Sequence, residues 1–94
     1  MSVTVKFIGS LRGLSGNSGL KLKLEESSPI REVIKIIIER APRLERALFD
    51  SERENPKTNV LILVNGKEIS VLDRFETMIK DGDEVVFIPV VHGG

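Results

Sequence analysis

Apolar and polar residues alternate near the start of the chain. Residues 3–8 place apolar side chains such as Val5 and Phe7 on one side and polar side chains on the other. Residues 20–24 repeat this pattern with three leucines and two lysines. A period of two predicts half-buried strands, so both segments are expected to be strands. Residues 9–19 between them hold glycines among Ser and Asn, which predicts a mobile loop closing a hairpin.

The spacing of apolar residues becomes helical after residue 28. Ser28 can accept hydrogen bonds from first-turn amides and Pro29 has no amide to leave unpaired, so the pair predicts a helix start. Pro42 is expected to end this helix. Residues 44–48 predict a short second helix, and the charged residues 50–59 predict an exposed loop. The helical stripe that should face the core consists of Ile30, Val33, Ile34, Ile37 and Ala41.

The second half of the chain begins with an unbroken apolar run. Val60 to Val64 is typical of a strand covered on both faces. Asn65-Gly66 is a two-residue turn signal, so residues 67–69 should form the second strand of a hairpin. The remaining expected elements are a single 3₁₀ turn within residues 72–79, a turn at Asp81-Gly82-Asp83 and a last strand over Glu84 to Val90.

The order strand, strand, helix, strand, strand, strand predicts an α+β fold of the β-grasp, or ubiquitin-like, type. One main helix crosses one face of a mixed sheet, and the last strand returns parallel to the first by a right-handed crossover. A chain of 94 residues is long enough for one core, so residues 1–94 are expected to form a single domain. Residues 91–94 then form a flexible tail.

The last strand is apolar on both sides, although only one side has a helix to cover it. Val86 and Ile88 should point away from the helix, together with one register of the strand at residues 60–64. This outer face is a candidate partner interface. An alternative is that Leu44 and Leu48 of the short helix, or the glycine-rich loop, cover it.

Composition restricts the chemistry further. The chain has no cysteine, so disulfides, thiolate metal sites and thiol nucleophiles are excluded. Lys+Arg and Asp+Glu both number 14, a balance that argues against general nucleic-acid binding. No apolar run approaches the roughly 18 residues that would span a membrane, and no signal sequence is evident. We therefore expect a cytoplasmic protein with no nucleic-acid or membrane partner.

Side chains offer no catalytic constellation. His92 has no second ligand at metal-binding spacing, and no metal site is predicted. Asp81 and Asp83 flank Gly82 and are better explained by a turn than by acid–base catalysis. We therefore expect no catalytic residue in this chain.

The unusual feature is the Gly93-Gly94 ending close behind an apolar strand. Residues without Cβ make a tail thin enough to thread a narrow channel, so His92 and Gly93 are predicted to thread one and Gly94 to react. A carboxylate is an anion at neutral pH and a poor electrophile, so it must first be activated by an external ATP-dependent enzyme. A sulfur donor would then leave a thiocarboxylate, and a lysine amine would leave an isopeptide.

Several segments resemble the MoaD family, the small subunit of molybdopterin synthase. They are residues 3–12 (VTVKFIGSLR), 64–68 (VNGKE), 80–85 (KDGDEV) and 87–94 (FIPVVHGG). The resemblance implies that Gly94 is adenylated by a MoeB-like activating enzyme using ATP and magnesium and then converted to a thiocarboxylate. It also implies a large synthase subunit that uses this sulfur to make molybdopterin, with the present chain as a non-catalytic carrier that completes the partner's active site.

Other readings stay open. The His-Gly-Gly ending resembles the ubiquitin-related modifier family, which is thiocarboxylated for tRNA thiolation and can also be joined to lysines. Residues 41–59 look longer than in a minimal MoaD protein or in the thiamin sulfur carrier ThiS. The leading hypothesis is a sulfur carrier for molybdenum cofactor biosynthesis. The alternatives are a protein modifier conjugated through Gly94 and an interaction module with an inert tail.

Overall fold

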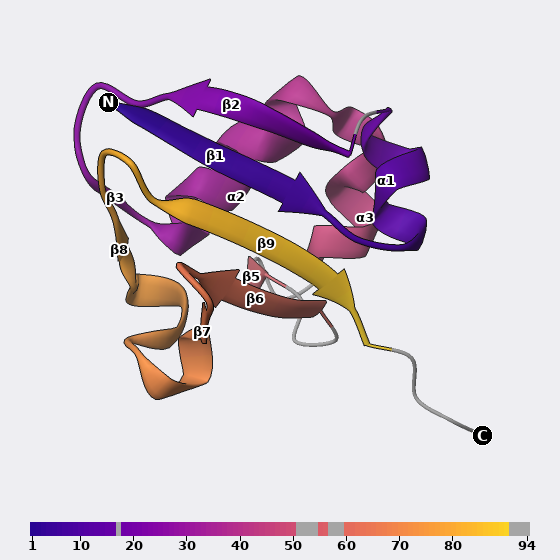
Figure 1. Ribbon diagram of the computed structural model, residues 1–94. Helices are drawn as coiled ribbons and strands as arrows, with labels where there is room; N and C mark the ends of the chain where they lie inside the picture. The colour runs from indigo at the N-terminus through magenta and orange to yellow at the C-terminus, as the bar shows by residue number, and fades with distance from the viewer. Residues whose placement is uncertain (17, 51–54, 57–59, 91–94) are drawn as a thin grey trace.

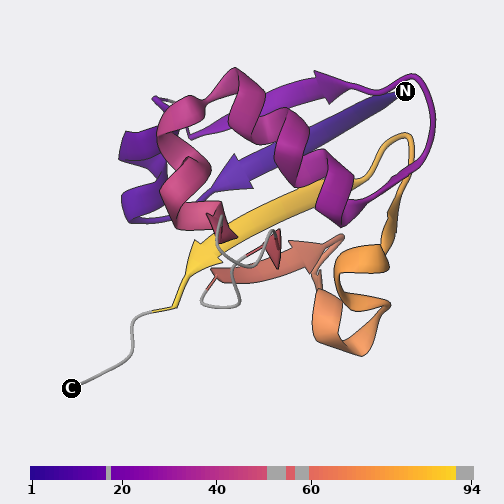
Figure 2. The ribbon, with the colours of Figure 1, turned by 180° about the vertical axis from the view of Figure 1, so that it is seen from behind.

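The computed structural model describes residues 1–16, 18–50, 55–56 and 60–90. Its main feature is a five-stranded mixed sheet with the order β2-β1-β9-β6-β7. β1 and β9 are parallel neighbours, and the other adjacent pairs are antiparallel. Helix α2 (Ile30–Arg40) runs across one face of this sheet (Figures 1 and 2). The β-grasp prediction is therefore confirmed. The strands are β1 (Ser2–Phe7), β2 (Gly19–Lys23), β6 (Val60–Val64), β7 (Lys67–Glu68) and β9 (Glu84–Pro89).

The core lies between α2 and the sheet. The helical stripe predicted from the sequence is buried from Ile30 to Ala41. Phe7 of β1 and Phe87 of β9 are fully buried beneath it, with stacked rings whose centroids are 5.7 Å apart. Since the two central strands supply the largest buried side chains, the position of β9 is fixed by the core as well as by hydrogen bonds.

The predicted glycine-rich loop is partly wrong, because residues 10–15 form helix α1 (Ser10–Ser15). Leu11 is 2% exposed and Leu14 packs partly against the core, so two leucines one turn apart hold this helix in place. Gly9 before it and Gly16 after it have φ of 61° and 80°. The glycines therefore bound a short helix at positions that require left-handed backbone.

The main helix begins later than predicted. Ser28–Pro29 forms β3, which pairs with β8 (Met78–Ile79), and α2 starts at Ile30. The Ile30 amide donates to the Thr77 carbonyl at 2.8 Å, so the β8 segment satisfies a first-turn donor. No side chain caps the helix at Pro29. The predicted end is confirmed, because Ala41 is the C-cap and Pro42 follows.

The predicted second helix is present as the 3₁₀ turn η1 (Pro42–Leu44) followed by α3 (Glu45–Leu48). The predicted exposed loop over residues 50–59 is only partly correct. β4 (Phe49–Asp50) pairs with β5 (Asn55–Pro56), and the other residues of that segment lie outside the described ranges. Cross-strand pairing between Phe49 and Pro56 was not evident from the charged sequence.

The Asn65-Gly66 turn is confirmed. Both residues have positive φ, 51° and 83°, as the tight turn between β6 and β7 requires. The strand expected at residues 67–69 ends at Glu68, because Ile69 starts a 3₁₀ turn. The single 3₁₀ turn expected within residues 72–79 is present as η3 (Arg74–Glu76), and a further 3₁₀ turn that was not predicted, η2 (Ile69–Val71), precedes it. No helix in the described part of the chain is long and apolar enough to cross a bilayer.

Candidate functional site

The end of the central strand β9 determines where the predicted tail is attached. The Ile8 amide donates to the Phe87 carbonyl at 3.0 Å, and Val60 is the cross-strand partner of Pro89. β9 is thus held by β1 as far as Phe87 and by β6 to its last residue, Pro89, and Val90 beyond it is 41% exposed. The chain leaves the sheet where β1 ends and β6 begins (Figure 1).

The tail residues singled out by the sequence lie beyond this point. His92, Gly93 and Gly94 are outside the described residues, so their roles in channel threading and activation stay predictions. What the structure adds is the geometry of the anchor at residues 87–90.

The anchor includes a close approach between Gly9 and Pro89. A Cβ on Gly9 would lie 3.4 Å from Pro89 Cγ, and Gly9 has a φ of 61°. Arg12 supports the same corner, because its Nε donates to the Phe7 carbonyl at 3.2 Å. The corner after β1 therefore packs tightly against the last residue of β9.

A group of apolar side chains lies on the sheet face opposite α2, beside the anchor. We call it the outer apolar patch, and it consists of Ile8, Leu61, Leu63, Val86 and Ile88. In the register of β6 and β9, Leu61 lies opposite Ile88 and Leu63 opposite Val86. These four side chains are half-buried, and Ile8 at the end of β1 is 37% exposed. The structure thus places Val86 and Ile88 on the face predicted for them.

The alternative that the short helix or the glycine-rich segment covers this face is wrong for the described residues. Leu44 and Leu48 are 0% and 2% exposed, and they belong to the core on the α2 side of the sheet. Leu11 of α1 is buried in the same core. Figure 1 shows α2 and α3 behind the sheet and α1 beside it, beyond the end of β1. The outer apolar patch therefore has no described helix over it.

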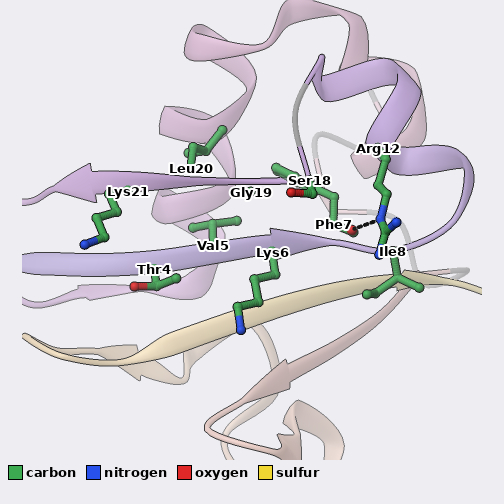
Figure 3. Close-up of a pocket in the computed structure, with 10 residues that line it drawn as sticks. All are labelled: Thr4, Val5, Lys6, Phe7, Ile8, Arg12, Ser18, Gly19, Leu20 and Lys21. Carbon is green, nitrogen blue, oxygen red and sulfur yellow. Dashed lines mark hydrogen bonds between the residues drawn. The ribbon is translucent and has the colours of Figure 1, made fainter.

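Cationic side chains border the patch on its β1–β2 side. Lys6 lies opposite Val86 across β1 and β9, and its Nζ is 3.0 Å from Glu84 Oε2. Arg12 and Lys21 line a shallow depression together with Lys6 (Figure 3). A partner that covered the patch would meet positive charge along this border.

The paired aspartates are structural, as the turn interpretation predicted. Asp81 Oδ1 accepts from the Ser2 amide at 2.7 Å. The Asp83 carboxylate accepts from Asn65 Nδ2 at 2.9 Å and from the Lys80 amide at 2.7 Å. Asn65 Oδ1 in turn accepts from the Glu84 amide at 2.9 Å. These bonds join the turn before β9 to the turn after β6.

Side-chain catalysis has no support in the described ranges. No three His, Cys, Asp or Glu residues there come close enough together to hold a metal ion. The carboxylates of Asp81 and Asp83 are engaged by amides. The described residues hold the end of β9 in place and present an apolar surface beside it.

Sequence reasoning missed Ile8 as part of the patch and left open which residues of β6 join it. The alternation in β1 could have identified Ile8, since it follows the buried Phe7. The unbroken run VLILV contains no polar residue that would mark its outer face. Leu61 and Leu63 can be assigned to that face only from the register of β6 with β9.

Sequence comparisons match the chain over nearly its whole length. The sequence model of the ThiS family matches residues 5–94. A Haloferax volcanii protein named small archaeal modifier protein 3 is 27% identical over 94 residues, covering 100% of both chains. A Caenorhabditis elegans homologue of ubiquitin-related modifier 1 is 27% identical, covering 98% of this chain and 95% of the relative.

Solved structures share the fold and the sequence pattern. Small archaeal modifier protein 1 from Methanosarcina acetivorans has a TM-score of 0.85 and 31% identity, with coverage of 99% and 96%. A Pyrococcus furiosus protein provisionally named molybdopterin converting factor, subunit 1, has a TM-score of 0.76 and 28% identity, with coverage of 97% and 99%. A chain of the Amycolatopsis orientalis BexX/CysO complex has a TM-score of 0.80 and 25% identity, with coverage of 98% and 99%.

Proposed function

The chain belongs to the ThiS family of ubiquitin-like proteins, and on that premise we propose that it is a sulfur carrier activated at the carboxylate of Gly94. One observation carries the proposal. The Gly93-Gly94 ending follows a central strand that is held by β6 to its last residue, beside an apolar patch that no described helix covers. A partner that docks on the patch is therefore next to the point at which the tail leaves the sheet.

The proposed chemistry takes place in two steps on the partner. A carboxylate oxygen of Gly94 attacks the α-phosphorus of ATP, so pyrophosphate leaves and an acyl adenylate forms. Hydrosulfide, or a donor that delivers sulfur at the same oxidation level, then attacks the carbonyl carbon, AMP leaves with one of the original carboxylate oxygens, a proton is released, and a thiocarboxylate remains. ATP and magnesium are held by the activating enzyme in this scheme. Because activation consumes ATP, the proposed site of action is the cytoplasm.

The reach of the tail restricts where the partner can dock. Four residues in extended conformation span at most about 13 to 14 Å, so the reacting site must lie close to Val90. We propose that a MoeB-like activating enzyme covers the outer apolar patch, with Val86 and Ile88 near the centre of the contact. The BexX/CysO complex supports the coarser point that proteins similar to this chain act together with a partner protein.

The first proposed acceptor of the sulfur is the molybdopterin precursor bound to a large synthase subunit. The MoaD-like segments support this, as does the likeness to the Pyrococcus furiosus protein provisionally named molybdopterin converting factor, subunit 1. In this role the chain completes the active site of a larger partner and contributes no catalytic side chain.

The second candidate is a protein modifier joined to lysines through Gly94. The names of the relatives from Haloferax volcanii and Caenorhabditis elegans favour it, because both proteins are called modifiers. The two roles share the adenylation step and differ in the nucleophile that follows. A single protein can therefore serve both, and the products distinguish them.

Deletion of Gly94 tests the shared step. The truncated chain should lose ATP–pyrophosphate exchange by the MoeB-like enzyme of the source genome while it keeps its melting temperature, because the described core ends at Phe87. Glu39→Ala, an exposed position near the end of α2, is the matched control and should keep full exchange. Exchange at the original rate after deletion of Gly94 would rule the proposal out.

A further inference from the structure

Strand β2 forms an edge of the main sheet, and it pairs only with β1 among the described strands (Figure 1). The Phe7 amide donates to Ser18 and the Leu24 amide donates to Met1. Antiparallel pairing alternates, so the even-numbered residues of β2 direct their N–H and C=O groups toward β1. The backbone groups of Lys21 and Lys23 then point to the open side of the sheet. This edge can accept another strand.

The outer face of this edge is positively charged. Lys21 and Lys23 are exposed, and neither forms an ion pair with a described residue within 4 Å. Gly19 has no side chain, which leaves a depression between its backbone, Lys21, Lys6 and Arg12 (Figure 3). Side chains of an added strand that point to this face would lie next to Lys21 and Lys23, and carboxylates would be favoured there.

On the side of this edge that faces α2, the surface includes apolar side chains. A second depression there is lined by Lys23, Leu24 and Ile36 together with Glu25, Glu26 and Ser28. Ile36 of α2 is only partly buried and packs against the core at its margin. Side chains of an added strand that point to this face would lie next to Ile36, so apolar residues would be favoured there.

We propose that the β2 edge binds an extended segment of a partner protein in which acidic and apolar residues alternate. The acidic residues face Lys21 and Lys23, and the apolar residues face Ile36. The segment is a different occupant from the one on the outer apolar patch, and it does not involve Gly94. A second copy of this chain is disfavoured, because antiparallel pairing of two β2 strands would bring lysines against lysines.

A peptide titration tests the proposal. An acetylated and amidated heptapeptide of alternating Asp and Val is added to the ¹⁵N-labelled full-length chain, and the same peptide with Lys in place of Asp is the control. The Asp peptide should shift the amides of Lys21 and Lys23 and slow their exchange with solvent. The amides of Leu20 and Leu22, which already bond to β1, should keep their protection. The Lys peptide should neither shift the amides of Lys21 and Lys23 nor slow their exchange with solvent.

Charge reversal sharpens the result. Lys21→Glu combined with Lys23→Glu should lower the affinity for the Asp peptide about tenfold at low ionic strength and raise that for the Lys peptide, because attraction becomes repulsion. Lys67→Glu combined with Lys80→Glu is the matched control away from β2 and should leave both affinities unchanged. Equal binding of the two peptides to the original chain would overturn the charge argument.

Backbone chemistry gives an independent test. Lys21→Pro removes an edge N–H without removing a bond to β1, so it should abolish peptide binding. If this variant does not fold, the charge-reversal pair still decides the outcome. Absence of shifts at Lys21 and Lys23 at millimolar peptide, or shifts confined to Ile8 and Ile88, would overturn the proposal. Deletion of Gly94 should leave peptide binding unchanged. The peptide experiment can therefore contradict the β2-edge proposal without contradicting the carrier function, and the reverse also holds.

Discussion

The two faces of β9 carry equally apolar side chains and have different surroundings. Val85 and Phe87 point toward α2 and are fully buried, whereas Val86 and Ile88 point away from it and are half-buried. The type of side chain does not distinguish the two faces. They differ in what packs against them, since α2 covers one face and no described helix covers the other. One strand can therefore stabilise the fold with one face and keep the other available for a partner.

The energetic consequence follows from where water is excluded. Burial of Phe87 against the core contributes to folding, since its apolar area is removed from water when the domain forms. The remaining exposed area of Val86 and Ile88 is removed from water only when something covers it. Substitutions on the two faces should therefore separate stability from binding.

Phe87→Ala should have the largest effect on stability. The side chain is fully buried and stacks on Phe7, so its loss should lower the free energy of unfolding by about 3 to 5 kcal/mol. Urea unfolding measures this, and Ile88→Ala is the matched control on the opposite face, with an expected loss of about 1 kcal/mol. Equal losses at the two positions would contradict the contrast between the faces.

Ile88→Asp should separate the two properties. Because Ile88 is half-buried outside the core, the free energy of unfolding should fall by less than about 1.5 kcal/mol. Affinity for the activating enzyme should fall at least about tenfold, since a charge would replace an apolar contact. Calorimetric titration measures the affinity, and Ser70→Asp on the exposed surface of η2 is the control that should bind normally. An unfolded Ile88→Asp variant would show that Ile88 belongs to the core.

Asp83→Ala tests the turn that fixes the register of β9 and so decides which residues occupy each face. Its carboxylate accepts two hydrogen bonds at a partly exposed site, so the expected loss is about 1 kcal/mol. Asp73→Ala is the control, because the Asp73 carboxylate accepts no hydrogen bond from a described residue, and it should change stability by less than about 0.5 kcal/mol. Thermal unfolding compares the two. Identical midpoints would mean that the turn does not depend on Asp83.

Gly93→Ala should have the smallest effect on stability and a measurable effect on activation. The residue lies beyond the strand that anchors the chain, so the free energy of unfolding should stay within about 0.5 kcal/mol. A Cβ widens the tail, so the rate of ATP–pyrophosphate exchange should fall. Gly13→Ala is the control, since a Cβ there meets no described heavy atom within 4 Å. If Gly93→Ala leaves the exchange rate unchanged, the channel around the tail is not narrow.

Much of the fold was predictable because most elements carry a clear period. The alternation in β1 and β2 identified the core face of these strands, and the helical spacing identified the buried stripe of α2. Helix α1 was not predicted, because the glycines of residues 9–19 indicated a loop. The spacing of Leu11 and Leu14, one helical turn apart, was not used. The start of α2 was misplaced because Thr77, far along the chain, supplies the acceptor that Ser28 was expected to supply.

The candidate site was predictable only in part. The two-residue period of a strand puts Val86 and Ile88 on one face together, and the structure places that face opposite the helix. Leu61 and Leu63 were not separable from their neighbours, because every residue of β6 is apolar and the register depends on β9. The free edge at Lys21 and Lys23 depends on the order of strands in the sheet, which short sequence motifs do not contain.

The intact mass of the protein isolated from its native source under sulfur-replete growth tests the central claim most directly. With no cysteine in the chain, sulfur that survives denaturation and is held at Gly94 should appear as one oxygen-to-sulfur exchange, and fragmentation should place that exchange on the last residue. The account predicts this thiocarboxylate, with few conjugates in which Gly94 is bonded to a lysine. An unmodified carboxylate together with abundant lysine conjugates would contradict the carrier function and favour the modifier.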